Sequence, residues 1–209
     1  MTKEKLVDLL RGKGSYTLKT ASERKEMWNK EFETLQDKNF SSIEFHDVDM
    51  SWFFFKGINF SGCKFSNVKL NGANCKMANF QGCHFENVVF NDADFTVANM
   101  KETTFFAVET KMTLFFRANF TKANLAEANF EEANFDGSNF EEANFRGANL
   151  AGTNFYMANL KGTDFTGANI NGANLERTII NEARGFEKKQ LETAINIPLD
   201  FALKFGIQQ

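Results

Sequence analysis

The 209 residues include 26 Phe but one Pro, two Trp and two Tyr, and 43% are hydrophobic, which excludes a globally disordered chain. The net charge of −3 and pI near 5.6 oppose electrostatic binding of nucleic acid, which needs an excess of basic residues. No apolar run approaches the roughly 18 residues of a membrane-spanning helix. We also see no signal peptide, and three Cys without a CxxC pair favour a reduced, cytoplasmic protein.

The first segment, residues 1–35, is predicted to be helical. Thr20–Glu23 form a capping-box pattern, and the helix that follows carries Trp28, Phe32 and Leu35 on one face. We expect this face to cover the open end of the domain that follows. The alternative is a free arm that binds a partner.

The central segment is built from blocks of five residues. The 145 residues from Gln36 to Ile180 divide into 145/5 = 29 blocks without an insertion. We call the central residue of each block, whose number is divisible by five, position i. Of the 29 centres, 18 are Phe; position i−2 is small or β-branched, i−1 is commonly Asn, and ten of the 14 Gly lie at i+2. The abundance of Phe is therefore in register with a repeat.

A period of five residues fits neither a continuous helix nor a continuous strand. Five residues advance about 140° on an α-helix, so no apolar stripe forms, and five residues along a strand reverse the face each time. The pattern predicts one turn per block, with i−2 and i pointing inward and i−1 outward. Positions i+1 and i+2 then make a corner, where Gly suits a positive φ.

The blocks resemble a known sequence signature. Runs such as Ala118–Lys122, Ala123-Asn124-Leu125 and Ala148-Asn149-Leu150 resemble the A-(N/D)-(L/F)-x-x repeats of pentapeptide-repeat proteins, over about 145 of 209 residues. The resemblance implies a bacterial protein and an all-β solenoid over residues 36–184, a right-handed quadrilateral parallel β-helix of about seven coils with helical caps. The expected core centres include Phe60, Phe80, Phe120 and Phe140.

The last segment, residues 185–209, leaves the repeat. The phase breaks after Ala183, residues 187–196 are predicted to be helical, and an apolar tail follows Pro198. In gyrase-protecting members of the family, a C-terminal appendage pairs two rods, so the resemblance implies a homodimer through residues 185–209. A cap folded on its own rod is the alternative.

Residue types that carry chemistry are sparse. His46 and His84 are predicted on the surface about two coils apart, and Cys63 and Cys83 stack on adjacent coils as core fillers or, alternatively, a disulfide. Phosphate-binding, zinc-protease and nucleophile-elbow motifs are absent from the sequence. We therefore expect no enzyme, no catalytic residue, no cofactor and no metal site.

The outward positions of one face carry large apolar residues that the fold does not require. We expect this face to bind an unidentified protein partner. Its candidate residues are Phe54, Met77, Val97, Leu114, Phe116, Tyr156 and Met157. Residues 100–117, where the repeat is degenerate, are interpreted as a tolerated irregularity rather than a second site.

An acidic group suggests a second function. Some family members resemble B-DNA in size and charge and occupy the DNA site of gyrase, so the resemblance implies a DNA-mimicking gyrase regulator as the alternative to an interaction scaffold. The candidate acidic patch comprises Glu127, Glu131, Glu132, Asp136, Glu141 and Glu142. Basic residues such as Lys122 and Arg146 interrupt it, so we favour the scaffold, without direct binding to nucleic acid or membrane.

Overall fold

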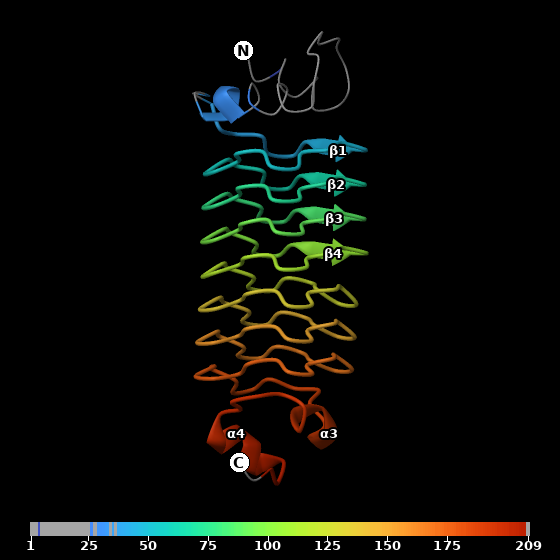
Figure 1. The fold of residues 1–209 in the computed structure, drawn as a ribbon, viewed down its shortest axis with the longest axis vertical. Coiled ribbons are helices and arrows are strands. Elements are labelled where there is room, and N and C mark those ends of the chain that lie inside the picture. Colours follow the sequence, from blue (N-terminus) through green and yellow to red (C-terminus); the bar gives the residue numbers. More distant parts are fainter. Residues whose placement is uncertain (1–3, 5–25, 27–28, 34, 36, 208–209) are drawn as a thin grey trace.

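The central segment winds into a straight rod of stacked coils (Figure 1). The structure, a computed structural model, describes residues 4, 26, 29–33, 35 and 37–207. Parallel bridges join residues twenty apart, from Asn39 with Asn59 to Asp164 with Arg184. Because a block has five residues, each coil has four faces and four corners, and the fold is the expected right-handed quadrilateral β-helix.

Regular strands form on one face of the first four coils. They make a single parallel sheet in the order β1-β2-β3-β4, with Phe45 in register with Phe65. Their bounds are β1 Glu44–His46, β2 Lys64–Ser66, β3 His84–Glu86 and β4 Thr104–Phe106. Each strand runs from i−1 to i+1, not from i−2 to i as expected, because these blocks keep residue i+1 extended. On the other faces the bridges involve single residues at i−1.

Every corner demands a left-handed backbone at its second residue. The residue at i+2 has a positive φ in each block from Ser42 to Glu182. The ten Gly of the repeats lie at these positions, as predicted, but the others carry side chains, among them Ala107 at φ 50° and Val97 at 60°. A left-handed conformation disfavours residues with a Cβ atom, so these corners are held in place by the stacking of the coils.

The interior is filled by columns of aromatic rings. Phe60 and Phe80 stack with ring centroids 5.2 Å apart, Phe120 and Phe140 at 4.8 Å, and all four are buried as predicted. Such contacts give the core close packing rather than a pore.

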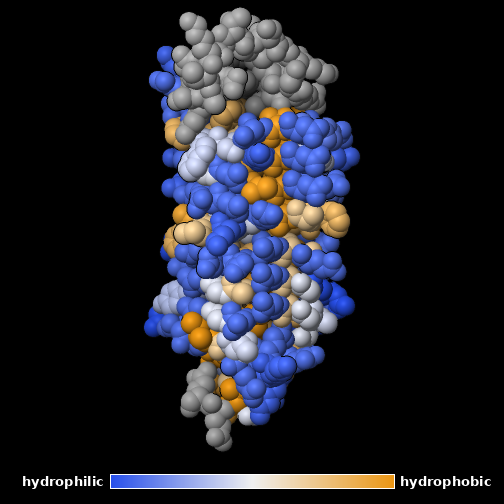
Figure 2. All heavy atoms as spheres, turned by 45° about the vertical axis from the view of Figure 1, so that its right-hand side comes forward, coloured by the Kyte–Doolittle hydropathy of each residue, from blue (hydrophilic) through white to orange (hydrophobic). Residues whose placement is uncertain are grey.

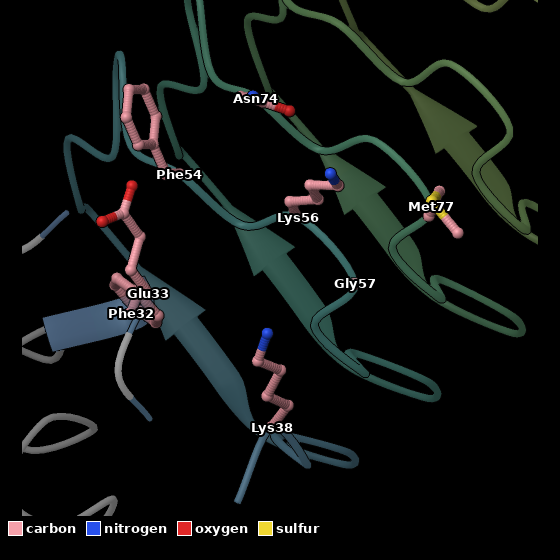
Figure 3. A pocket seen from close by; sticks show the side chains of 8 residues that line it. All are labelled: Phe32, Glu33, Lys38, Phe54, Lys56, Gly57, Asn74 and Met77. Carbon is pink, nitrogen blue, oxygen red and sulfur yellow. The ribbon is translucent and has the colours of Figure 1, made fainter. Parts of the chain in front are cut away.

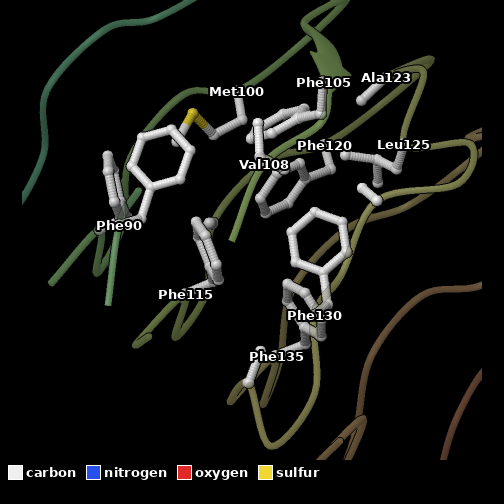
Figure 4. Close-up of a cluster of buried hydrophobic side chains, with 14 of the residues drawn as sticks. Phe90, Met100, Phe105, Val108, Phe115, Phe120, Ala123, Leu125, Phe130 and Phe135 are labelled. Atoms are coloured by element: carbon white, nitrogen blue, oxygen red, sulfur yellow. The ribbon is translucent and has the colours of Figure 1, made fainter. Parts of the chain in front are cut away.

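The degenerate blocks keep this packing (Figure 4). Thr110 replaces an apolar centre, is fully buried, and its hydroxyl donates to the carbonyl of Asn129 at 2.9 Å. The ring of Phe130 then lies against Phe105 and Phe115, with centroids 5.7 and 6.2 Å away. Residues 100–117 therefore continue the rod, which supports their interpretation as a tolerated irregularity.

Outward Asn side chains tie the coils together. Asn79 Nδ2 donates to Asn59 Oδ1 at 3.0 Å, and Asn99 Nδ2 donates to Asn79 Oδ1 at 2.9 Å. The same Oδ1 atom of Asn79 accepts from the backbone N–H of Gln81, at the first corner position. An Asn at i−1 can thus stabilise both its own turn and the stacking of neighbouring coils.

The two stacked cysteines serve as hydrogen-bond donors in the core. Cys63 Sγ donates to the carbonyl of Phe40 and Cys83 Sγ to that of Phe60, each at 2.9 Å. Thr163 makes the same bond to Phe140. The two sulfurs are separate thiols, so core packing describes them and the disulfide alternative does not.

The N-terminal helix closes the first coil. Phe32, in the helical stretch 29–33, is buried, and its ring lies 4.8 Å from that of Phe55. Asn29 Oδ1 accepts a hydrogen bond from the backbone N–H of Phe54. In the next coil the equivalent N–H, that of Asn74, donates to the carbonyl of Phe53 in the coil before. These contacts agree with the capping interpretation. Leu35 packs against the core, and the predicted contributions of Thr20–Glu23 and Trp28 lie outside the described residues.

The C-terminal segment closes the last coil in a similar way. Phe186, one residue late, still stacks on Phe165 at 4.6 Å, and α3 (Lys188–Leu191) and α4 (Leu199–Lys204) follow. Gln190 Nε2 donates to the carbonyls of Phe165 and Ala168, which a further coil would otherwise cover. Phe201 and Leu191 are buried, so this segment caps its own rod. A homodimer through residues 185–209 stays a prediction.

A first prediction concerns the N-terminal cap. Replacing Phe32→Ala removes the ring that closes the core and should lower the free energy of unfolding by about 3 kcal/mol. Glu33→Ala, a change at an exposed neighbour, should leave it within about 0.5 kcal/mol. Urea unfolding followed by circular dichroism measures both. An equal effect of the two changes would show that Phe32 does not cap the core.

A second prediction concerns the corners. Ala107→Gly should raise the free energy of unfolding by about 1 kcal/mol, because Gly accepts the positive φ without a steric penalty. Ala126→Gly, at the first corner position of the next coil, lies outside the positive-φ set and should lower the free energy by about 0.5–1 kcal/mol. Effects of the same sign in urea unfolding would contradict this explanation.

Candidate functional site

The seven residues predicted to bind a partner lie along one face of the rod and its adjoining corner. The outward column of this face, joined by parallel bridges, begins with Phe54, Asn74, Asp94 and Leu114. We call this the Phe54 face. We call the corner that follows it the Met77 corner, with Phe116 and Tyr156 at its first position and Met77, Val97 and Met157 at its second.

Five of these seven side chains are plainly exposed. Met77 is 61% exposed, and the others in this group are Phe54, Val97, Leu114 and Met157. Figure 2 shows how such groups interrupt a mainly hydrophilic surface on the side of the rod that it displays. Because inward positions already fill the core, these side chains contribute little to the fold and are available for contact.

The two aromatic corner residues are half-buried under arginines. The guanidinium carbon of Arg117 lies 4.9 Å from the ring centroid of Phe116, and that of Arg177 lies 5.6 Å from Tyr156. Arg177 also donates to the Tyr156 hydroxyl at 2.7 Å. These cation–π contacts order the aromatic rings while leaving part of each accessible.

One ion pair lies within the Phe54 face. Lys76 Nζ is 3.0 Å from Asp94 Oδ2, and the backbone N–H of Thr96 donates to Asp94 Oδ1 at 2.9 Å. Burial raises the pKa of the Asp94 carboxyl, but the bonds from Thr96 and from Lys76 outweigh it, so the pKa is lowered. Asp94 is therefore ionised at neutral pH and holds Lys76 against the face.

A hollow lies where the N-terminal helix meets the first coils (Figure 3). It encloses about 490 Å³, and its wall combines apolar groups with two lysines. The lining residues are Phe32, Glu33, Lys38, Phe54, Lys56, Gly57, Asn74 and Met77. The sequence pattern placed Phe54 and Met77 on this face but missed the hollow, because its rim depends on how the helix packs on the rod.

The opposite corner of the same face carries two residues that sequence reasoning missed. Trp52 is 50% exposed and Met112 is 57% exposed, both at the second corner position. The ring of Trp52 lies over Gly72, where an added Cβ would meet it within 2.2 Å. Their register relative to the repeat was visible in the sequence and could have identified them.

The six candidate acidic residues surround one coil instead of covering one face. Successive blocks turn successive corners, so Glu127, Glu132, Asp136 and Glu142 lie on four different corners. Glu131 shares the corner of Glu132, and Glu141 that of Glu142. Three of the six lie near lysines: Glu132 with Lys111 at 3.9 Å, Glu141 with Lys161 at 3.4 Å and Glu142 with Lys122 at 3.5 Å.

The remaining polar groups make local contacts. His46 lies 3.6 Å from Glu44, and His84 contacts the hydroxyl of Thr104 on the next coil. Burial raises the pKa of the Cys75 thiol, so it is held protonated in the core. Within the described part of the chain, no three His, Cys, Asp or Glu side chains gather as metal ligands, and no helix could cross a bilayer.

Comparison with family models decides the classification. Two models, both described as pentapeptide repeats, match the chain, one over residues 34–104 and the other over 114–150 and 143–181. The chain belongs to the pentapeptide-repeat family. No curated protein sequence matches it.

Solved structures of other pentapeptide-repeat proteins are similar to this chain. QnrB1, a plasmid-mediated fluoroquinolone resistance protein, is 21% identical over 70% of this chain and 79% of its own, with a TM-score of 0.48. HetL from the cyanobacterium Nostoc, involved in heterocyst differentiation regulation, is 16% identical over 83% and 94%, with a TM-score of 0.37. A protein of the Arabidopsis thaliana thylakoid lumen is 28% identical over 59% and 65%, with a TM-score of 0.21.

A third prediction follows from Asp94. Because its pKa is lowered in the folded chain, its contribution to stability is present above the unfolded value of about 3.9 and is lost as the pH falls through the folded value. Asp94→Asn should therefore lower the free energy of unfolding more at neutral pH than near pH 3. The difference between the two pH values should be less than about 1 kcal/mol, because the ion pair is partly exposed to solvent. Lys76→Gln should reduce this pH-dependent part. Urea unfolding across the pH range tests both, and a constant difference between wild type and Asp94→Asn would contradict it.

Proposed function

We propose that this protein is a non-catalytic scaffold that binds a protein partner through the Phe54 face and the Met77 corner. The observation that carries the proposal is a set of large apolar side chains on a rigid surface that does not need them for its own packing. Phe54, Met77 and Val97 are each more than 40% exposed on consecutive coils. Exposed apolar groups that recur along one edge are typical of protein-binding surfaces.

The regular backbone supports this role. Each block donates the N–H groups of its residues to carbonyls of its own turn and the neighbouring coil, as Phe60 does to Asn79 at 2.7 Å and Cys63 does to Phe60 at 3.0 Å. A rod held in this way presents its outward residues at a fixed spacing of about 4.8 Å. Because the scaffold is already rigid, it loses little conformational entropy when a partner that fits this spacing binds.

The charge distribution favours a scaffold over a DNA mimic. Mimicry of B-DNA requires carboxylates spaced along the rod like phosphates, whereas the six candidates encircle about one coil and Glu132, Glu141 and Glu142 lie near lysines. We therefore propose an interaction scaffold rather than a gyrase regulator. Inhibition of gyrase supercoiling, or its protection from a fluoroquinolone, at micromolar protein would overturn this choice.

A fourth prediction tests the surface. Phe116→Glu or Tyr156→Glu places a charge within the Met77 corner and should reduce partner binding at least tenfold (about 1.4 kcal/mol) without unfolding the rod. Phe106→Glu is the control, because Phe106 is also at position i+1, is 67% exposed and lies at the end of β4, away from the Met77 corner. Affinity capture from a native lysate with the purified, folded variants measures the effect. Capture that all three variants leave intact would remove this surface from consideration.

A further inference from the structure

The residues at the second position of the Met77 corner form a column that can match a second, reversed copy of itself. In that arrangement its methionines face its glycines and its acidic end faces a basic end. Read from the first coil to the last, the column alternates between large, small and charged residues. The column is Asp37, Gly57, Met77, Val97, Arg117, Gly137, Met157 and Arg177. In a symmetric dimer the same surface must fit itself, with residue x against y and y against x.

We propose that a second copy of this chain packs antiparallel along the Met77 corner. The two-fold axis passes between the coils of Val97 and Arg117. The inference rests on the proposed function and names the partner of that same surface. Reversing one rod about this axis places each corner residue of one copy against the partner position in the other.

Shape complementarity supports this register. Met157 of the second copy lies against Gly57, and Met77 lies against Gly137 of the second copy. An added Cβ at Gly57 would meet no atom within 4 Å, so the backbone there is open, and the hollow of about 490 Å³ lies beside it. Methionine is flexible and fills irregular apolar spaces well. The socket at Gly137 is shallower, because the Cγ atom of Arg117 lies 3.2 Å from a Cβ added at that glycine.

Charge complementarity supports the same register. Lys76, which also pairs with Asp94 of its own chain, lies against Asp136 of the second copy. Asp37 lies against Arg177, and Lys56 approaches Tyr156, whose ring also contacts Arg177. Among the described residues, the carboxylate of Asp136 and the ammonium of Lys56 make no ion pair within their own chain. Glu176 of the second copy lies near Lys38, at one end of the hollow. Opposite charges at both ends fix the direction and register of the pair.

The other corners lack these features. The corner of Gly62 and Gly82 exposes no large apolar residue at its second position within the described coils. At the corner of Trp52 and Met112, the same operation would place Trp52 against Gly152 but Asp92 against Met112. Among the described residues, the corner of Phe106 and Ala107 exposes no large apolar residue at its second position. After reversal the Met77 corner places both methionines of its second position against glycines and opposite charges at both ends. At its centre Val97 lies against Arg117, whose guanidinium is held over the ring of Phe116.

The contact is expected to be weak and reversible. Seven spacings of about 4.8 Å give a contact about 34 Å long. A surface one corner wide falls at the low end of specific interfaces, below about 1,200 Å² in total. The dimer should therefore form in the micromolar range and dissociate on dilution.

Disulfide trapping tests the register directly. The three native cysteines are buried, so an introduced surface cysteine is the accessible thiol. In Val97→Cys the two introduced thiols lie one coil spacing apart along the rod, about 5 Å, which a disulfide can span. In Met157→Cys they lie about five spacings apart, near 24 Å, which it cannot. Under mild oxidation we expect a covalent dimer of the first variant and none of the second.

Sedimentation equilibrium of the full chain provides the second test. Met157→Lys should raise the dissociation constant of the dimer at least about tenfold, because it places a positive charge over Gly57, beside Lys38 and Lys56 in the wall of the hollow. Met112→Lys is the matched control, since Met112 has nearly the same exposure and the same corner position on another corner. It should leave the constant unchanged.

The outcomes separate this inference from the proposed function. A chain that stays monomeric up to hundreds of micromolar, or a dimer that neither Val97→Cys traps nor Met157→Lys weakens, overturns the antiparallel pair. The latter result would point to residues 185–209. If the chain is monomeric but Phe116→Glu still abolishes capture of another protein, the scaffold function stands without this dimer. If the chain is monomeric and Phe116→Glu leaves the capture of another protein unchanged, both proposals fail.

Discussion

Each inward side chain of this rod rests on the side chain twenty residues before it, and the rest of the structure depends on that repeated contact. The rings of Phe95, Phe115, Phe135 and Phe155 stack at 5.2 Å along one column. Such stacking requires equivalent residues of successive coils to stay in register, and the 29 uninterrupted blocks of the sequence provide this. The strained corners follow from the same requirement, because the chain must turn after each centre whatever residue lies at i+2.

The two ends show what happens when the stacking stops. At the first coil, Asn29 and Phe32 replace the hydrogen bonds and the ring that a preceding coil would supply. At the last coil, Gln190 and Phe186 do the same. In both places a side-chain amide satisfies backbone groups and a phenylalanine closes the core. A solenoid must protect its open ends in this way, since unpaired backbone edges otherwise invite further strands.

Function then depends on what the outward positions carry, because the repeat constrains them little. Most of them are Asn, charged or small residues, which suit a solvated surface. The Phe54 face and the Met77 corner depart from this rule with aligned apolar groups and a hollow between the rod and its N-terminal cap. The second-position column of the Met77 corner places its methionines against its glycines after reversal, and the proposed pairing with a second copy is based on this order.

The sequence by itself determined the register of the rod, because a period of five with Phe at the centres permits one arrangement of inward and outward positions. It therefore placed Phe60 in the core and Phe54, Met77 and Phe116 outside, and it located the break after Ala183. Tertiary structure decided which outward residues meet. The acidic residues Glu127 and Glu141 are close in sequence yet lie on different corners, and the hollow beside Gly57 exists because a helix from outside the repeat packs over the first coil. Periodicity describes contacts within the stack, but contacts between the stack and its caps depend on packing that no period encodes.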